Sequence, residues 1–224
     1  MMEPILDLKG ISKQYSGVMA LENIDLAIQK GKIHSIVGEN GAGKSTLIKI
    51  ITGAVKPTTG NVFFRGSEVH ETNPRKSLEM GISAVYQEFN LISELKIYEN
   101  IFYGRELKKG LTLDAELMKQ RSDEVLKKIG MNMDTEIKLK YLGIGSRQTI
   151  EIAKALIQES EVVLFDEPTA SLTQEEVNNL HRIIKNLRDS GIAVIYVSHK
   201  LDEVFEISDT ITVLRDGKHI RTTQ

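Results

Sequence analysis

The sequence predicts an α/β fold built on a parallel sheet, and three observations support this expectation. The β-branched run at residues 33–37 passes through a glycine-rich loop into a helical run that stops at Gly53. Residues 162–165 form a short apolar run typical of a buried parallel strand. Residues 88–160 lose strand-like runs and take on helical spacing. We therefore expect an α/β core with an antiparallel β subdomain and an inserted α-helical subdomain.

The 224-residue length suits one large domain. We expect a single domain over residues 1–224, with a core at about 1–87 and 161–224 and a helical subdomain at about 88–160. The net charge of −2 gives no reason to expect a nucleic-acid partner, and the absence of cysteine excludes disulfides and thiolate metal sites. No apolar run approaches the length of a bilayer span, and the first residues lack the features of a signal peptide. Any membrane role is expected to come through a partner.

Alternating or continuous apolar patterns predict the strands of this fold. They cover residues 5–11, 24–28, 61–64, 82–86, 162–165, 192–197, 211–214 and 218–220. Helical spacing covers residues 97–103, 114–129 and 147–157, and Pro74 opens a further short helix. Thr173 and Glu176 form a capping box for a helix that runs to about Asp189. Asp216-Gly217 predicts a hairpin turn between the last two strands.

Residues 38–46 fit the phosphate-binding P-loop pattern G-x-x-x-x-G-K-[ST]. The glycines let backbone N–H groups point at a phosphate, and the helix start adds its dipole. Lys44 is expected to reach the β and γ phosphates, and the Ser45 hydroxyl to ligate Mg²⁺. A glycine-rich turn without a ligand is the alternative, and the complete motif between a strand and a helix argues against it. The predicted nucleotide-binding residues are Gly38, Glu39, Asn40, Gly41, Ala42, Gly43, Lys44, Ser45 and Thr46.

Two adjacent acids, Asp166 and Glu167, follow the buried run at residues 162–165. In a parallel sheet they lie at the same edge as the P-loop, so Asp166 is expected to hold Mg²⁺ opposite Ser45. Glu167 is well placed to orient or deprotonate a water that attacks the γ phosphate. The alternative is a pair of solvated acids at a strand end, and the P-loop in the same chain favours the site.

Three further residues have both a functional and a structural interpretation. His199 ends a strand and could contact the γ phosphate or be structural, and Gln87 could contact Mg²⁺ or the attacking water or only cap a loop. Tyr15 precedes the P-loop and could stack on adenine, a contact worth ~1–3 kcal/mol by analogy with other bases. A core tyrosine is the equal alternative for Tyr15.

Taken together, these motifs resemble the nucleotide-binding domain of ATP-binding cassette (ABC) transporters over essentially the whole chain. Tyr15 matches the adenine-stacking aromatic, residues 38–46 the Walker A loop and Gln87 the Q-loop. Residues 162–167 match Walker B with its catalytic glutamate, and His199 matches the switch histidine. The amino-acid sequence at residues 37–43, 87–91 and 99–106 is similar to that of sugar-import ATPases of the ribose, xylose and galactose type, which carry two such domains in one polypeptide.

The resemblance implies a P-loop NTPase core that binds ATP and Mg²⁺, with metal contacts from Ser45, Gln87 and Asp166 and catalytic roles for Glu167, His199 and Gln87. It implies an ATPase that energises sugar import from the cytoplasmic face of the cell membrane, bound to transmembrane permease subunits. The paired nucleotide-binding domain would be a fused C-terminal half or a second copy, and a periplasmic or extracellular sugar-binding protein would act indirectly. The segment after Gln87 contains four apolar residues, Phe89, Leu91, Ile92 and Leu95. These residues would either dock a cytoplasmic helix of the permease or pack in the core of the helical insertion.

Two positions depart from the family pattern. The signature Leu-Ser-Gly-Gly-Gln falls at residues 142–146, just before the helix expected from Arg147, and reads Leu-Gly-Ile-Gly-Ser, so Gly143 lacks the expected hydroxyl. Backbone N–H groups at that helix start can still face a phosphate. The D-loop position usually held by aspartate is Thr173. In the family, both elements act across a dimer interface on the nucleotide of the opposite domain. The changes therefore either put the function of the partner's site in doubt or are tolerated variation within a subfamily.

Other functional classes remain as alternatives. A soluble ABC-type ATPase, for example one associated with the ribosome, shares the motifs, although the near-neutral charge argues against RNA binding. The helical stretch is too short and lacks the heptads of the chromosome-type members. A GTPase would need an Asn-Lys-x-Asp motif, which is absent, and a P-loop kinase has no obvious use for Glu167. Only Gly143 and Thr173 support a catalytically inactive regulatory module.

Overall fold

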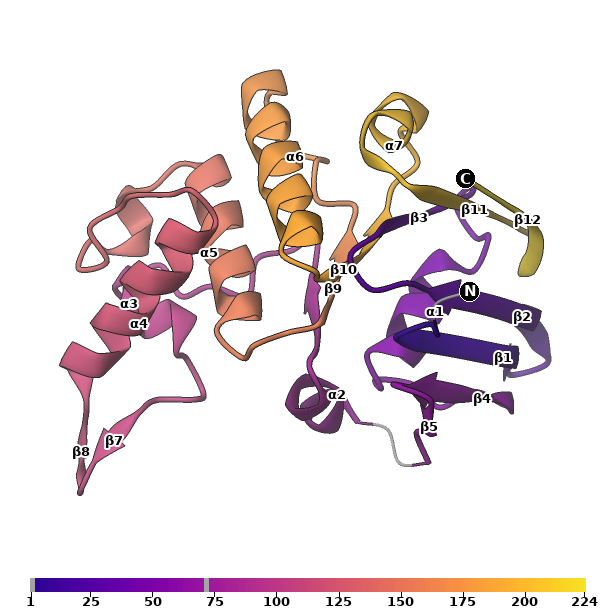
Figure 1. Cartoon of the computed structure of the whole chain (residues 1–224), viewed down its shortest axis with the longest axis horizontal. Helices are drawn as coiled ribbons and strands as arrows, with labels where there is room; N and C mark the ends of the chain where they lie inside the picture. The colour runs from indigo at the N-terminus through magenta and orange to yellow at the C-terminus, as the bar shows by residue number, and fades with distance from the viewer. Residues whose placement is uncertain (1–2, 71–72) are drawn as a thin grey trace.

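A six-stranded sheet forms the centre of the molecule, as seen in the computed structural model, which describes residues 3–70 and 73–224. Its strand order is β12-β11-β3-β10-β9-β6. All neighbouring strands are parallel except β11 and β12, which pair antiparallel at one edge of the sheet. The strands are β3 (Ile33–Val37), β6 (Ile82–Val85), β9 (Val162–Asp166), β10 (Ala193–Val197), β11 (Thr210–Arg215) and β12 (Lys218–Thr223). The predicted α/β class is thus confirmed (Figure 1).

A second, antiparallel sheet packs against one face of the first, with the order β2-β1-β4-β5. Its strands are β1 (Leu6–Tyr15), β2 (Val18–Ile28), β4 (Thr59–Phe64) and β5 (Ser67–Glu68). Between the sheets lies α1 (Lys44–Ile51), whose buried Leu47 and Ile48 join a cluster with Leu8 of β1 and Ile36 of β3. This layer fixes the start of α1, and with it the phosphate loop, against two sheets at once.

Helices cover the other face of the six-stranded sheet, and Figure 1 shows α7 (Leu201–Ile207) and α1 on opposite sides of β3 and β11. The long α6 (Gln174–Asp189) buries apolar residues at helical spacing, namely Val177, Leu180, Ile183, Ile184 and Leu187. The last four of these side chains share a core cluster with Val163 of β9 and Tyr196 of β10. The predicted capping box of Thr173 and Glu176 opens α6.

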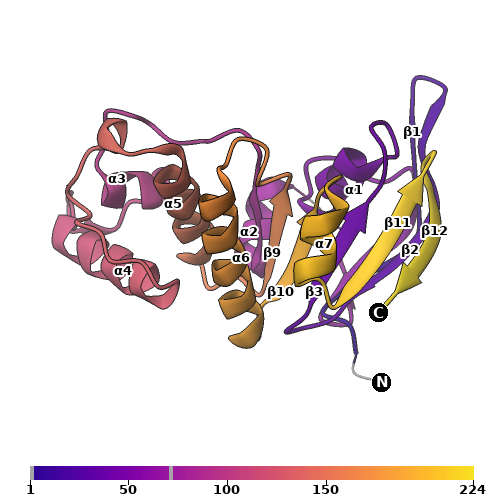
Figure 2. The ribbon, with the colours of Figure 1, turned by 90° about the horizontal axis from the view of Figure 1, so that it is seen from above.

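The stretch between β6 and β9 is mostly helical and lies on the far side of α6 from the antiparallel sheet (Figure 1). It contains α3 (Ile97–Ile101), α4 (Ala115–Lys128), the 3₁₀ turn η1 (Leu139–Tyr141) and α5 (Ile144–Leu156). Both views place α5 and α6 side by side (Figures 1 and 2). Since Ile150 and Ile152 of α5 belong to the same apolar cluster as α6, the helical stretch is packed onto the core.

The local predictions agree with the structure in most places and fail in two. Pro74 opens α2 (Pro74–Met80), and the turn between β11 and β12 has positive φ at Asp216 and Gly217, as a two-residue hairpin loop requires. The stretch expected to lack strands contains a short hairpin, β7 (Lys108–Lys109) and β8 (Thr112–Leu113). The helix expected from Arg147 begins earlier, at Ile144. None of the helices within the described ranges has the length and apolarity to cross a bilayer.

Candidate nucleotide site

Four neighbouring strands of the large sheet each end in one of the predicted motifs. In sheet order they are β3, β10, β9 and β6, although β10 comes last of these in the chain. The P-loop follows β3, His199 follows β10, Asp166 and Glu167 close β9, and Gln87 follows β6. The parallel register therefore gathers segments from distant parts of the chain at one edge of the sheet, the edge at which open α/β sheets bind ligands.

The P-loop is closely packed around its glycines. Gly43 has φ 101° and precedes the first residue of α1, Lys44. A Cβ at Gly43 would lie 2.6 Å from Leu21 Cδ2 and 2.7 Å from the Ala20 carbonyl oxygen, so only glycine fits there. Lys44 is 7% exposed, and its Nζ donates hydrogen bonds to the carbonyls of Gly38 at 2.7 Å and Glu39 at 3.1 Å. The loop thus curls around the lysine ammonium group and holds it in place.

A cavity of about 190 Å³ opens at this loop. Its lining includes Ala20 of β2 and Glu167, which directly follows β9. The other lining residues are six from the P-loop, namely Asn40, Gly41, Gly43, Lys44, Ser45 and Thr46. Backbone N–H groups at a helix start, a lysine and a carboxylate therefore meet around one space. Such a set can receive a polyphosphate and place an acid beside its terminal group.

The two acids at the end of β9 differ in their setting. Asp166 pairs with Val197 of β10, whereas Glu167 leaves the strand with φ 46° and donates its N–H to the Val197 carbonyl at 2.9 Å. This left-handed residue costs on the order of 1–3 kcal/mol and turns the glutamate toward the cavity. Burial, and then the Glu167 charge, raise the pKa of Asp166, while Lys44 opposes the shift. A cation near Asp166 would relieve both effects.

His199 contacts the second acid directly. Its Nδ1 lies 3.2 Å from Glu167 Oε1, and Glu167 is the more buried partner. The imidazole therefore holds one oxygen of the carboxylate and can set its orientation toward the cavity. The sequence leaves two interpretations for His199, a contact with the γ phosphate or a structural role. The structure shows a direct contact with the carboxylate, and a phosphate contact stays a prediction.

Gln87 and Tyr15 lie outside the cavity lining. Gln87 is exposed just after β6, and no hydrogen bond within residues 3–70 and 73–224 joins it to Lys44, Asp166 or Glu167. Tyr15 ends β1 and is 41% exposed, so the core interpretation of this residue is wrong. Lys13 Nζ lies 5.0 Å from the ring centroid of Tyr15. The exposed part of the ring offers an aromatic surface at the exterior of the molecule. Both remain candidates for contacts that only a bound nucleotide would create.

The sequence did not indicate Ala20 as part of the site. It lines the cavity and its carbonyl abuts Gly43. Its contribution is main chain, and a strand alanine has no side-chain chemistry that a pattern could single out. Only the packing of β2 against the P-loop reveals it.

The signature-equivalent loop, residues 142–146, lies at the start of α5. Gly143 is the N-cap, has no side-chain cap hydrogen bond, and has nothing within 4 Å of the position of a Cβ. The Gly145 N–H, one of the groups expected to be free at this helix start, instead donates to Glu176 Oε1 at 3.0 Å. That contact was not predicted, because it joins residues that are 31 positions apart.

Comparison with known proteins identifies the family. The sequence pattern of the ABC transporter family matches residues 21–170, and the chain belongs to this family, with the fold of its ATP-binding cassette. The ADP conformation of MJ1267, an ATP-binding cassette of an ABC transporter, superposes with a TM-score of 0.89 at 26% identity, covering 100% of this chain and 92% of that one. A dimeric cassette, MJ0796, gives 0.82 at 28% identity with 98% of both chains covered.

Curated relatives include sugar-import ATP-binding proteins. The galactose/methyl galactoside import protein MglA of Clostridium perfringens is 42% identical over 97% of this chain and 42% of its own length. The ribose import protein RbsA of Clostridium tetani is 44% identical over 97% of this chain and 44% of its own length. The arabinose import protein AraG of Yersinia pestis is 43% identical over 98% and 42%. The chain thus spans less than half the length of these relatives.

Proposed function

We propose that this chain binds MgATP in the P-loop cavity and hydrolyses ATP to energise the import of a sugar by an ABC transporter. The observation that carries this proposal is the convergence of Lys44, Glu167 and the P-loop backbone around one cavity. Support for transport rather than another ATPase role comes from MglA, RbsA and AraG, which are 42–44% identical to this chain over the aligned residues.

The chain's own groups divide the work of hydrolysis. The P-loop N–H groups and Lys44 bind the phosphates and offset the charge that develops on the γ phosphate and the leaving oxygens. Glu167 orients a water molecule for attack on the γ phosphate and accepts its proton. His199, through its contact with Glu167 Oε1, keeps that carboxylate in place. Tyr15 offers its exposed ring to the adenine.

The donor set also fits Mg²⁺, which prefers oxygen ligands. Ser45 at the start of α1 and Asp166 at the end of β9 would hold the ion, with Gln87 as a further ligand. Asp166 has a raised pKa because it is buried beside Glu167, and a divalent cation would stabilise its ionised form. When bound, the ion neutralises phosphate charge.

A second nucleotide-binding domain, fused or a separate copy, is the proposed partner. Its signature and D-loop would cover the nucleotide held at Lys44, and those of this chain would cover the partner's nucleotide. Missing one preorganised donor can cost ~10²–10³ in rate. An isolated cassette is therefore expected to bind MgATP and to hydrolyse it slowly.

ATPase activity as a function of protein concentration tests this proposal. Calorimetry should show MgATP binding, and specific activity should rise with concentration as cassettes pair. Light scattering on the same samples reports the oligomeric state. Fast turnover, independent of concentration, by demonstrably monomeric protein would contradict the paired mechanism.

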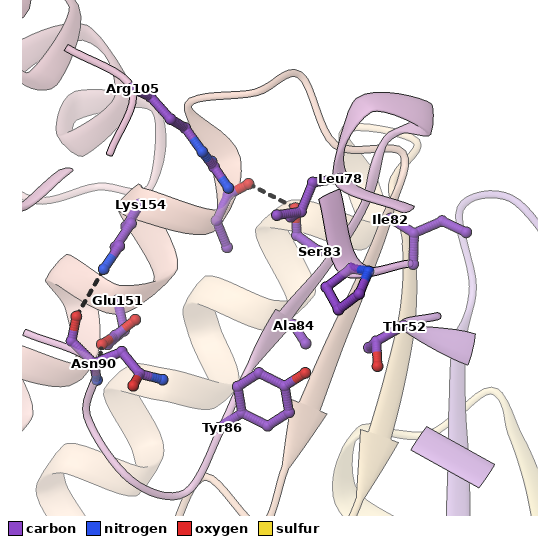
Figure 3. A pocket seen from close by; sticks show the side chains of 12 residues that line it. Thr52, Leu78, Ile82, Ser83, Ala84, Tyr86, Asn90, Arg105, Glu151 and Lys154 are labelled. Carbon is purple, nitrogen blue, oxygen red and sulfur yellow. Dashed lines mark hydrogen bonds between the residues drawn. The ribbon is translucent and has the colours of Figure 1, made fainter. Parts of the chain in front are cut away.

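We also propose that the helical subdomain, at about residues 88–160, docks the cytoplasmic part of a permease, which would place the chain at the cytoplasmic face of the membrane. Where this subdomain meets the core lies a cavity of about 180 Å³ between α2, β6 and α5, lined by Tyr86, Asn90, Arg105 and Lys154 among others (Figure 3). The Arg105 guanidinium is half-buried and has no hydrogen bond or ion pair within the described ranges. An acidic side chain from a docked helix would pair with it.

Pull-down of the chain with its permease tests the docking. Phe89→Ser, in the apolar segment after Gln87, and Arg105→Glu, in the cavity, should each reduce capture. Arg182→Glu makes the same charge change at an exposed position of α6, outside the helical subdomain, and serves as the control. Undiminished capture by both variants would contradict docking at this surface.

A further inference from the structure

The two positions that depart from the family pattern lie on loops that the structure joins. Gly143 belongs to the signature-equivalent loop before α5, and Thr173 is the N-cap of α6. The two helix starts are close enough to share one side chain, the Glu176 carboxylate. This carboxylate takes no part in the proposed binding of ATP or in the proposed attack of water on the γ phosphate.

Each oxygen of Glu176 serves a different loop. Oε1 accepts the N–H of Gly145 at 3.0 Å. Oε2 accepts the N–H of Thr173 at 2.9 Å and its hydroxyl at 3.0 Å. The approach also depends on Gly145, because a Cβ there would lie 2.6 Å from Glu176 Oε1 and 2.8 Å from its Cγ. The contact is therefore built into both loops.

The electrostatics of this contact favour an ionised side chain. A carboxylate at a helix N-terminus accepts orphan N–H groups and is stabilised by the helix dipole, and Glu176 faces two such ends. The hydrogen bonds from Thr173, with a smaller contribution from Gly145, lower the pKa of Glu176. At neutral pH the contact is therefore a charge-assisted bridge between α5 and α6.

We propose that Glu176 is a positioning residue that locks the signature-equivalent loop to the D-loop, so that the chain presents both to its partner's nucleotide as one unit. The inference rests on the proposed function, in which these two loops act across the pair. It explains how the chain keeps the start of α5 in position without a capping side chain at Gly143. Glu176 itself has no contact with the reacting atoms in this account.

Amide hydrogen exchange, followed by NMR on the chain alone, tests the bridge. Glutamine keeps the size of the side chain but has one acceptor oxygen, so Glu176→Gln must release at least one loop. Exchange at Gly145 or Thr173 is expected to rise about tenfold, the usual effect of losing a charge-assisted hydrogen bond. Glu176→Ala should release both amides. Unchanged exchange at both positions in both variants would overturn the bridge.

A mixing experiment separates the role toward the partner from any role in the chain's own fold. The acceptor is parental chain at a low, fixed concentration. The donor is a Lys44→Ala chain in excess, so that all turnover comes from the acceptor's nucleotide while the donor supplies the two loops. Adding Glu176→Gln to the donor is expected to lower the maximal stimulated rate at least tenfold, while the acceptor's KM for ATP stays the same.

The matched control is Glu175→Gln in the donor, because the neighbouring acid lies in the same first turn of α6 and makes no hydrogen bond to Gly145 or Thr173. It should stimulate like the unmodified donor. Equal stimulation by the Glu176→Gln and Glu175→Gln donors would overturn the inference. If the unmodified donor gave no stimulation, the paired mechanism of the proposed function would be wrong instead, and the exchange data would still decide whether the bridge exists.

Discussion

The sheet edge that carries the P-loop cavity and the loop pair at the starts of α5 and α6 are built in different ways. At the sheet edge, buried parallel strands set the position of each group, and β3 and β9 have interiors without exposed residues. In the loop pair, one side chain, Glu176, joins the two elements. The family pattern is complete in the first region and altered in the second. The comparison indicates that the proposed ATP site is held in place by the core, whereas the loops proposed to face a partner are held together by a single side chain.

The largest effect is expected at the sheet edge. Glu167→Gln removes the proposed general base and should lower turnover by ~10²–10⁴, the usual contribution of such a group. MgATP binding, measured by calorimetry, should persist because the P-loop and Lys44 are unchanged. Glu175→Gln serves as a control for the loss of a carboxylate. Parental turnover by the Glu167 variant would show that this assignment is wrong.

A buried histidine in β3, the strand before the P-loop, should make the stability of the fold sensitive to acid. His34 is buried, and its Nε2 lies 2.7 Å from Thr212 Oγ1. Burial, with a smaller contribution from His219, lowers the pKa of His34 from 6.5 to about 4. The unfolded chain therefore takes up the proton first. Stability should be complete above pH 6.5 and fall as the pH drops, by about 3 kcal/mol at pH 4 from this residue.

Urea unfolding at several pH values measures this effect. His34→Gln should flatten the fall in unfolding free energy between pH 6.5 and 4, whereas His70→Gln, at an exposed position, should leave it unchanged. Identical pH profiles for the parental chain and the His34 variant would exclude this residue as the cause.

Adenine binding gives a smaller effect at the rim of the site. Tyr15→Ala should weaken ATP binding by ~1–3 kcal/mol, which corresponds to a Kd about 5- to 150-fold higher. Tyr15→Phe should retain most of the affinity, since the ring supplies the contact. Tyr141→Ala removes another exposed ring, near the signature-equivalent loop, and should not change cis binding. Equal affinities for the Tyr15→Ala variant and the parental chain would show that adenine binds elsewhere.

The smallest effect is expected from a single substitution in the loop pair, Gly143→Ser. Gly143→Ser restores a hydroxyl where open space exists and provides an N-cap for α5. Serine exceeds glycine as a cap by only a few tenths of a kcal/mol, so thermal unfolding should shift up by about 1 °C. In the mixing assay the same change in the donor should raise stimulated turnover. A drop in both quantities would mean that Gly143 is required as it stands.

Much of the site could be predicted because its functional residues lie in short, contiguous sequence motifs. The P-loop, the two acids and the strands before them are local patterns, and the parallel sheet brings them to one edge. The order of the strands could not be read in this way, because β10 inserts between β3 and β9 through tertiary packing. Ala20 acts through its main chain, which leaves no sequence pattern.

The start of α5 shows a second limit. Glycine disfavours helix, so the run with Gly143 and Gly145 indicated a loop up to Arg147. The structure extends the helix to Ile144, and the distant Glu176 accepts one of its orphan N–H groups. Local propensity cannot anticipate a stabilising group from another helix.

Titration calorimetry of MgATP into the parental chain and into Lys44→Ala tests the central claim most directly. The account predicts saturable one-to-one binding by the parental chain and a loss of at least ~2 kcal/mol in the variant, about 30-fold in Kd, because a phosphate-binding charge is removed. Equal binding by the two proteins, or no binding by a folded parental chain, would contradict it.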